Sequence, residues 1–224
     1  MMRAKLARLL FLVAAVCFST SPARAQGVRI FLMGGGSFLD DNRTFNSGLG
    51  VPYQSTYAHG AKIIFGGEIS PAKILGFEAS YANGPNSLRL TDQAASQTFS
   101  YGIHGQRLSG DVVLHSPKTY YSVRPYLSGG LEFDHLGPSD PAKNQAATLG
   151  FAGQIVTLGA SNKLGFNYGA GLEWSSLPSL GLRLDLRDHV ISTPTYGLTS
   201  SQFPISGRAH EVEISAGVVF HIGK

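Results

Sequence analysis

Cysteine is almost absent from this sequence, which has Cys17 as its one cysteine among 224 residues. Cys17 lies in an N-terminal segment that we expect to be removed, so the mature chain has neither disulfide bonds nor thiol chemistry. Val16 precedes it, where lipoprotein signals carry a small residue, which argues against acylation of Cys17.

Long hydrophobic runs are also lacking, apart from the short run Leu9–Phe18. Basic residues precede this run, and Ala23-Arg24-Ala25 follows it as an A-x-A cleavage site. This arrangement is typical of a secretory signal peptide, and the run is short for a membrane-spanning helix. We therefore expect residues 1–25 to be a signal peptide that is removed, and residues 26–224 to form one domain.

The mature chain has no excess of charge of either sign. The sequence has 18 Lys and Arg against 14 Asp and Glu, but four of the basic residues lie in the signal peptide. The mature chain therefore has no net charge, and the basic character of the whole sequence does not indicate a nucleic-acid partner.

Helical periodicity is missing after the signal peptide, and eight segments alternate apolar and polar residues instead. Because side chains alternate between the two faces of a strand, this pattern predicts eight β-strands. The segments are 27–39, 58–69, 74–84, 99–115, 122–134, 163–174, 179–190 and 209–222. The alternation changes phase in the fourth segment, which predicts a β-bulge near Gly105.

The connections between these segments alternate between two kinds. Three of them are short and contain proline, which stops strand pairing. The other four are long and polar, at about 40–57, 85–98, 135–162 and 191–208. This asymmetry predicts an up-and-down antiparallel barrel with short turns at one end and long loops at the other.

Two eight-stranded barrels fit this pattern. A soluble lipocalin-like barrel places its apolar face inward around a ligand, whereas a transmembrane barrel places it outward into lipid. The polar face here mixes charged residues with glycine and serine, which suits the narrow interior of an eight-stranded barrel. Aromatic residues lie near the ends of the apolar faces, as in the girdles at a membrane interface. We therefore expect an all-β, eight-stranded transmembrane β-barrel.

The stretch Leu180–His189, "LGLRLDLRDH", shows the two faces most clearly. Leu180, Leu182, Leu184 and Leu186 are expected to face lipid, and Arg183, Asp185 and Arg187 are expected to face the lumen. The residues that we expect in contact with lipid are Leu172, Trp174, Leu182, Leu184, Leu186, Ile214, Val218 and Phe220.

Charged residues gather on the polar face. No Lys, Arg, Asp or Glu falls on the apolar face of the regular part of any segment, whereas seven basic and nine acidic residues lie opposite. An unpaired buried charge is costly, so we expect these residues to form a connected network. For Arg183, Asp185 and Arg187 we expect partners on the neighbouring segments, chiefly Glu173 and Glu211 or Glu213. The lumenal set is Arg29, Lys62, Glu68, Glu78, Arg107, Asp111, Arg124, Glu132, Asp134, Lys163, Glu173, Arg183, Asp185, Arg187, Glu211 and Glu213.

The segments "RPYLSGGLEF", "NYGAGLEW" and "GLRLDLRDHV" resemble strands of small outer-membrane β-barrels of the OmpA/OmpX-like class. The resemblance covers residues 27–222. It implies a monomer in the outer membrane with periplasmic termini and four long loops outside, inserted by the outer-membrane assembly machinery among outer-membrane lipid and lipopolysaccharide. It also implies a role in envelope integrity or surface adhesion, or a narrow pore. One departure is that the chain passes Phe220 and ends His221-Ile222-Gly223-Lys224, where such chains often end on an aromatic residue.

Catalytic and metal-binding patterns are weak. His115 and Ser116 are adjacent, but they fall at a short turn, so turn chemistry explains the serine better than a lipid A-modifying active site does. His104 and His210 lie nearer the long loops, with no Ser and acid pattern beside them. The seven histidines show no metal-ligand spacing, and we expect no cofactor. The sequence therefore favours a non-enzymatic membrane barrel. A periplasmic lipocalin-like barrel and a lipid A-modifying barrel enzyme are the alternatives.

Overall fold

The computed structural model describes residues 27–40, 42–47, 50–152, 154–175 and 177–222. The expected signal peptide, including Cys17, lies outside the described residues. Within the described part, no helix is long and apolar enough to cross a membrane.

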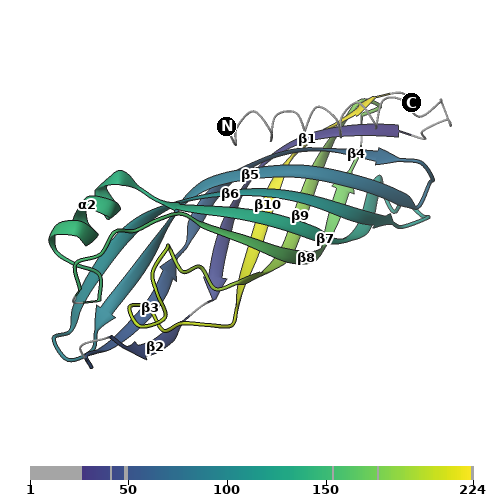
Figure 1. The fold of residues 1–224 in the computed structure, drawn as a ribbon. Coiled ribbons are helices and arrows are strands. Elements are labelled where there is room, and N and C mark those ends of the chain that lie inside the picture. The colour runs from purple at the N-terminus through teal and green to yellow at the C-terminus, as the bar shows by residue number, and fades with distance from the viewer. Residues whose placement is uncertain (1–26, 41, 48–49, 153, 176, 223–224) are drawn as a thin grey trace, which may run out of the picture.

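Antiparallel strands dominate the fold, and eight of them close into a ring (Figure 1). The ring runs β5–β4–β1–β10–β9–β8–β7–β6 and returns to β5. The first and last strands of the chain pair along their length, from Val28 opposite Ile222 to Asp40 opposite His210. The expected eight-stranded antiparallel up-and-down barrel is thus confirmed. The elements are β1 (Gly27–Asp40), β2 (Arg43–Asn46), β3 (Pro52–Ala58), β4 (Gly60–Ser70), β5 (Leu75–Asp92), β6 (Gln97–His115), β7 (Val123–Pro138), α2 (Asp140–Thr148), β8 (Ser161–Trp174), β9 (Leu180–Ser192) and β10 (Arg208–Ile222).

The long connections are more ordered than the sequence indicated. The expected loop 85–98 is mostly strand, because β5 and β6 stay paired from Leu75 opposite Leu114 to Asp92 opposite Gln97. The expected loop 40–57 forms a hairpin of β2 and β3, and β3 also pairs with the outer part of β5. The expected loop 135–162 contains α2, a helix that the sequence analysis did not predict.

Helix α2 has a clear local cause. Ser139 is its N-cap, and the Ser139 side chain accepts a hydrogen bond from the amide of Ala142. Asp140 lies in the first turn, where a negative charge is favourable, and proline is tolerated there because it needs no hydrogen-bond partner. Ala142 and Ala146 face inward and are buried.

These elements form what we call the cap, made of β2, β3, the outer parts of β5 and β6, α2 and the loops 149–160 and 193–207. It lies beyond the end of the ring opposite to the start of β1 and the end of β10 (Figure 1). Its apolar core consists of Phe45, Tyr53, Leu88, Leu90, Tyr101, Ile103, Ala142, Ala146, Phe151, Ala152, Val156, Leu158, Tyr196, Leu198, Phe203 and Ile205.

The bulge expected near Gly105 is absent. β6 pairs with β5 without interruption, and its inward residues keep one phase, from Tyr101 and Ile103 to Arg107 and Asp111. What changes along β6 is the environment of the inward face, which is the apolar core in the cap and the charged lumen below it. The alternation of apolar and polar residues along β6 therefore reverses, although the strand contains no bulge.

Candidate functional site

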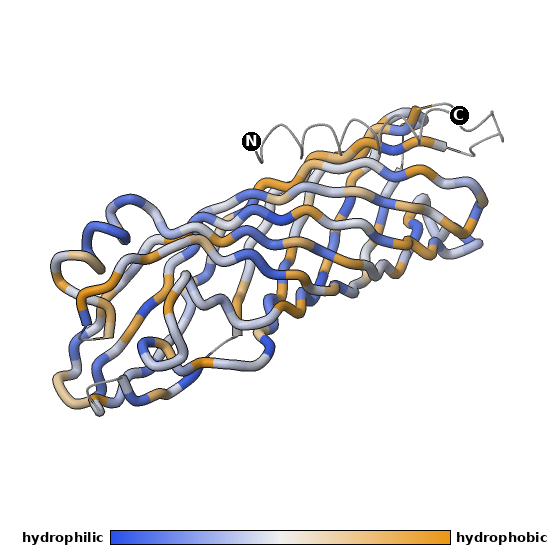
Figure 2. Tube along the Cα trace, in the orientation of Figure 1, coloured by the Kyte–Doolittle hydropathy of each residue, from blue (hydrophilic) through white to orange (hydrophobic). Residues whose placement is uncertain are grey.

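The candidate site is the interior of the ring, where charged side chains are buried while large apolar residues on the outside remain exposed. Hydropathy alternates along each strand accordingly (Figure 2). Fourteen of the sixteen residues expected in the lumen take part in ion pairs within the described part of the chain. They form three groups along the barrel.

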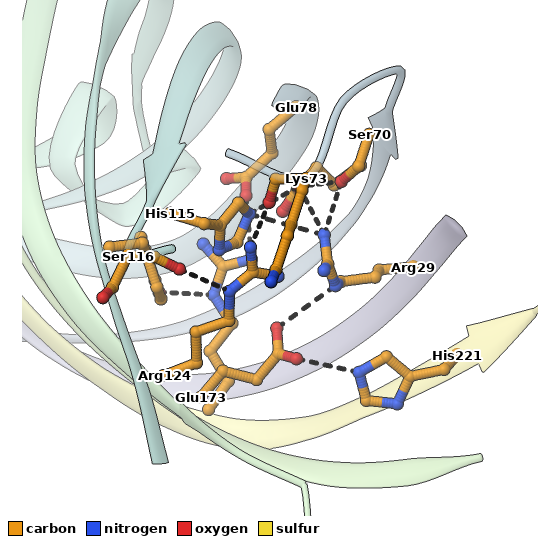
Figure 3. Close-up of polar contacts among 12 residues, drawn as sticks. Arg29, Ser70, Lys73, Glu78, His115, Ser116, Arg124, Glu173 and His221 are labelled. Atoms are coloured by element: carbon orange, nitrogen blue, oxygen red, sulfur yellow. Dashed lines mark hydrogen bonds and ion pairs between the residues drawn. The ribbon is translucent and has the colours of Figure 1, made fainter. Parts of the chain in front are cut away.

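The first group lies near the start of β1 and the end of β10 and is centred on Arg29 of β1 (Figure 3). The Arg29 guanidinium contacts Glu68 at 2.6 Å and Glu173 at 3.4 Å. Each of these carboxylates also contacts one imidazole: His115 is 2.7 Å from Glu68, and His221 is 2.8 Å from Glu173. Arg29 therefore links two carboxylate–histidine pairs that come from four other strands.

Two arginines and three carboxylates form the middle group. Arg187 contacts Asp111 at 2.6 Å and Glu78 at 2.6 Å, and Arg183 contacts Glu78 at 2.8 Å. Asp185 lies between the two arginines on β9, at 2.9 Å from Arg183 and 3.2 Å from Arg187. The Arg183 guanidinium also stacks between two aromatic rings, those of Phe31 at 4.4 Å and Tyr126 at 4.7 Å.

The outer group lies directly below the cap and is centred on Arg107 of β6. Arg107 contacts Asp134 at 2.9 Å and Glu211 at 2.5 Å, with Glu132 and Glu213 slightly farther away. Lys62 also pairs with Glu211. His189, which is buried, contacts Glu132 at 2.6 Å.

The remaining two expected lumenal residues behave differently. Arg124 is half-buried near the first group, and its guanidinium donates to the backbone carbonyls of Lys73 and Ser116 rather than to a carboxylate. Lys163 is half-buried beside Asp134 in the strand register, but it forms no ion pair with the residues that the structure describes.

The partners expected for the arginines of β9 were wrong. Arg183 and Arg187 do not pair with Glu173, Glu211 or Glu213, although the strand register places Glu173 and Glu213 beside them. Their ion-pair partners beyond β9 lie on β5 and β6, across the barrel. In an eight-stranded ring the interior is narrow, so a long guanidinium reaches the opposite wall.

Little free space remains inside. A small apolar group, Phe31, Met33, Ile64, Ala82 and Val219, fills part of the interior beside the charges. The cavity between the outer group and the cap has a volume of about 20 Å³, and a second cavity near Phe31 and Arg187 has about 10 Å³. A water molecule needs about 10–15 Å³ on this measure, so each cavity holds about one water.

The outer wall carries the residues expected in contact with lipid. Leu172, Trp174, Leu182, Leu184, Leu186, Ile214 and Phe220 expose between 43% and 51% of their surface, and Val218 is half-buried beside them. We expected no charged residue on the apolar face of the regular part of any segment. This expectation was wrong, because Asp188 faces outward between Leu186 and Val190. Among the described side chains that face outward from the eight ring strands, Asp188 is the one carboxylate.

Asp188 is held by two neighbours that the sequence analysis did not connect with it. The Tyr168 hydroxyl donates to Asp188 Oδ2 at 2.6 Å, and His210 Nδ1 lies 2.9 Å from the same oxygen. The three residues come from β8, β9 and β10. Alternation along β9 places Asp188 on the same face as the leucines, and this signal was present in the sequence.

The structure brings together no catalytic serine and histidine at the short turn. His115 faces the interior, and the Ser116 hydroxyl donates to the carbonyl of Lys118. Across the described residues, no group of three or more His, Cys, Asp or Glu side chains is arranged to hold a metal ion.

No family model matches this chain, and no curated protein matches it. Solved structures do resemble it. The outer membrane protein OprG from Pseudomonas aeruginosa superposes with a TM-score of 0.59 at 11% identity, over 88% of this chain and 97% of OprG. Neisserial surface protein A superposes with a TM-score of 0.53 at 16% identity, over 86% of this chain and 96% of that protein. The outer membrane protein AlkL, whose structure was determined in DMPC lipid bilayers, superposes with a TM-score of 0.53 at 13% identity, over 91% of this chain and 94% of AlkL. The chain thus has the fold of small outer-membrane β-barrels.

Proposed function

We propose that this chain is a non-enzymatic outer-membrane β-barrel that holds a rigid cap at the cell surface for contact with other surfaces. The observation that carries the proposal is the closed interior. Ion pairs fill the lumen, the apolar cap covers its outer end, and the cavities between them hold about one water each. This arrangement suits a membrane anchor and does not favour the narrow pore.

The outward apolar belt supports a place in the membrane. On β10 it runs from Val212 to Ile222, and ten residues of a strand tilted as in such barrels rise about 25 Å, the height of a barrel's apolar band. A soluble lipocalin-like barrel would place these residues inward. We further propose that the chain is a monomer inserted by the outer-membrane assembly machinery, with its termini in the periplasm and the four long connections outside.

The cap supports a role in surface contact. Its core is built from loops as well as strands, so it presents a fixed shape. At the turn after α2, Leu149 and Ile155 leave 71% and 66% of their surface exposed. Apolar patches on an ordered surface typically mark contact sites. We propose that these two residues take part in adhesion.

Two measurements test this function. In planar bilayers the purified barrel should give no stable single-channel conductance, and large steady conductance would move the function to a pore. In a non-adherent strain, surface expression of the chain should increase attachment to apolar and cell-derived surfaces. Leu149→Ser with Ile155→Ser should remove that gain, whereas Lys143→Gln on the exposed side of α2 should keep it. Equal attachment by cells without the chain would contradict the adhesive role.

A further inference from the structure

Asp188, Tyr168 and His210 form a polar cluster on the outer wall and take no part in the ion pairs that fill the lumen. A carboxylate facing hydrocarbon is costly, so ionisable residues at such places usually have a function. On β10, His210 is the next outward residue beyond Val212, where the apolar belt ends. The three side chains therefore lie at the outer boundary of the belt, at the level of lipid headgroups in the proposed membrane.

The geometry of the three residues leaves His210 Nε2 available to a group outside the cluster. Asp188 Oδ2 accepts from both Tyr168 and His210 Nδ1, which fixes the imidazole ring. His210 Nε2 makes no hydrogen bond to the described residues, and half of the side chain is exposed. Asp188 is thus a positioning residue that points His210 Nε2 outward.

A permanently charged side chain follows on the same face of β10. Arg208 is the previous outward residue of β10 and is exposed, so its backbone lies about 7 Å from that of His210 on the same face. A guanidinium binds phosphate oxygens through charge-assisted hydrogen bonds, and an imidazole on the same face can add a further contact.

An apolar hollow begins at the same place. It has a volume of about 560 Å³ and is lined by Leu127, Tyr168, Ala170, Leu186, Asp188 and Val212, among others. A second hollow of about 490 Å³ shares Leu127, Ala170 and Leu186 with it and extends to Leu114, Leu172 and Leu184. The hollows exist because small residues of β8 lie between the leucines of β7 and β9.

We propose that this face binds one molecule of a phosphorylated glycolipid of the outer leaflet, with a headgroup phosphate at His210 and Arg208 and an acyl chain in the hollow over Ala170. The arginine and imidazole at the outer end and the apolar groove below them match a lipid in both polarity and direction. A second copy of this chain would fill the groove but would leave no anion for Arg208. The proposal rests on the membrane location proposed above.

The test uses the full mature protein, folded into phosphatidylcholine vesicles that contain bisphosphorylated lipid A, extracted in mild detergent and weighed by native mass spectrometry. The wild-type barrel should retain one lipid A. His210→Gln combined with Arg208→Gln should lower retention about tenfold or more, as expected for the loss of charge-assisted hydrogen bonds. His104→Gln combined with Arg89→Gln changes the same residue types on outward positions of β6 and β5 and should leave retention unchanged.

A second pair of variants tests the groove. Ala170→Phe should fill the shared hollow and reduce retention, whereas Ala216→Phe fills a separate hollow on β10 and should not. The proposal would be overturned if the barrel retained dephosphorylated lipid A as well as the bisphosphorylated form. It would also be overturned if the mass were that of a protein dimer without lipid, or if the bound lipid had lost an acyl chain. A barrel that inserts into vesicles but retains no lipid A refutes this site alone. A chain that does not insert refutes the membrane proposal as well.

Discussion

Glu78 and Arg187 stand on opposite walls of the barrel, four strands apart in the ring, and their side chains meet at 2.6 Å. Glu78 also pairs with Arg183, so one carboxylate holds two arginines across the lumen. This carboxylate links β5 to β9 through the interior and not through the strand ladder.

Removal of the Glu78 charge should destabilise the barrel. Glu78→Gln keeps the size of the side chain but leaves Arg183 and Arg187 short of negative charge in a buried place, which should cost about 3–5 kcal/mol. Urea titrations of folding in lipid vesicles would measure the loss. Lys163→Gln is the matched control in the same lumen, and it should change stability by less than about 1 kcal/mol because Lys163 forms no ion pair with the described residues. Equal stability of Glu78→Gln and the wild type would show that the network adds nothing.

The lumen also depends on a glycine. A methyl group added at Gly171 of β8 would overlap the ring of Tyr126 and approach the carbonyl oxygen of Leu184 to 2.6 Å. Because the Tyr126 hydroxyl accepts a hydrogen bond from Arg183, the ring cannot move freely. Gly171→Ala should therefore cost about 1–3 kcal/mol, as overpacking does elsewhere.

Gly110→Ala provides the control for this substitution, because nothing lies within 4 Å of the added methyl group. Tyr126→Ala should reduce the penalty of Gly171→Ala when the two are combined, since residues in contact are not additive. Additive effects in the same urea titrations would show that the clash is not with Tyr126.

The sequence predicts the faces of the strands better than the contacts between them. Alternation from Leu180 to Arg187 is enough to place Arg183 inside and Leu184 outside, because a strand has a period of two. It does not indicate that Arg187 meets Glu78, because that contact depends on which strands face each other across the closed ring. For the same reason, the sequence does not indicate that His115 pairs with Glu68 or that His221 pairs with Glu173.

The cap was missed because its pattern is the reverse of that in the barrel below. Leu88 and Tyr101 face inward on the same strands as Glu78 and Asp111, so a rule that places polar residues inside reads them as a change of phase. Asp188 was missed because the other charges of β9 alternate with the leucines and lie on the opposite face. Its position four residues after Leu184 already put it on their face.

The outward face is tested by a charge at its centre. Leu184→Arg should cost about 2–4 kcal/mol if Leu184 faces the middle of a bilayer. Leu149→Arg on the exposed cap should change stability by no more than about 0.5 kcal/mol. Folding titrations in vesicles compare the two variants. A Leu184→Arg barrel as stable as the wild type would mean that this face does not contact lipid.

The cap should lose stability at alkaline pH through Tyr101. Burial raises the pKa of Tyr101 to about 12, with a smaller contribution from Tyr53, and the Tyr101 hydroxyl donates to the carbonyl of Gly150 at 2.6 Å. The pKa in the folded cap is above the ordinary value of about 10, so the folded state holds this proton more tightly than the unfolded state does. The resulting stability is fully present below pH 10 and is lost as the pH rises through 12.

Near-ultraviolet circular dichroism between pH 9 and 12.5 would follow this change, because the cap core is rich in tyrosine and phenylalanine. Tyr101→Phe should weaken the cap at neutral pH by about 1 kcal/mol, since the Gly150 carbonyl loses its partner, and should reduce the alkaline transition. Tyr121→Phe is the control, because Tyr121 is 99% exposed at the opposite end of the barrel. An alkaline transition of the same size in Tyr101→Phe and in the wild type would show that another group causes it.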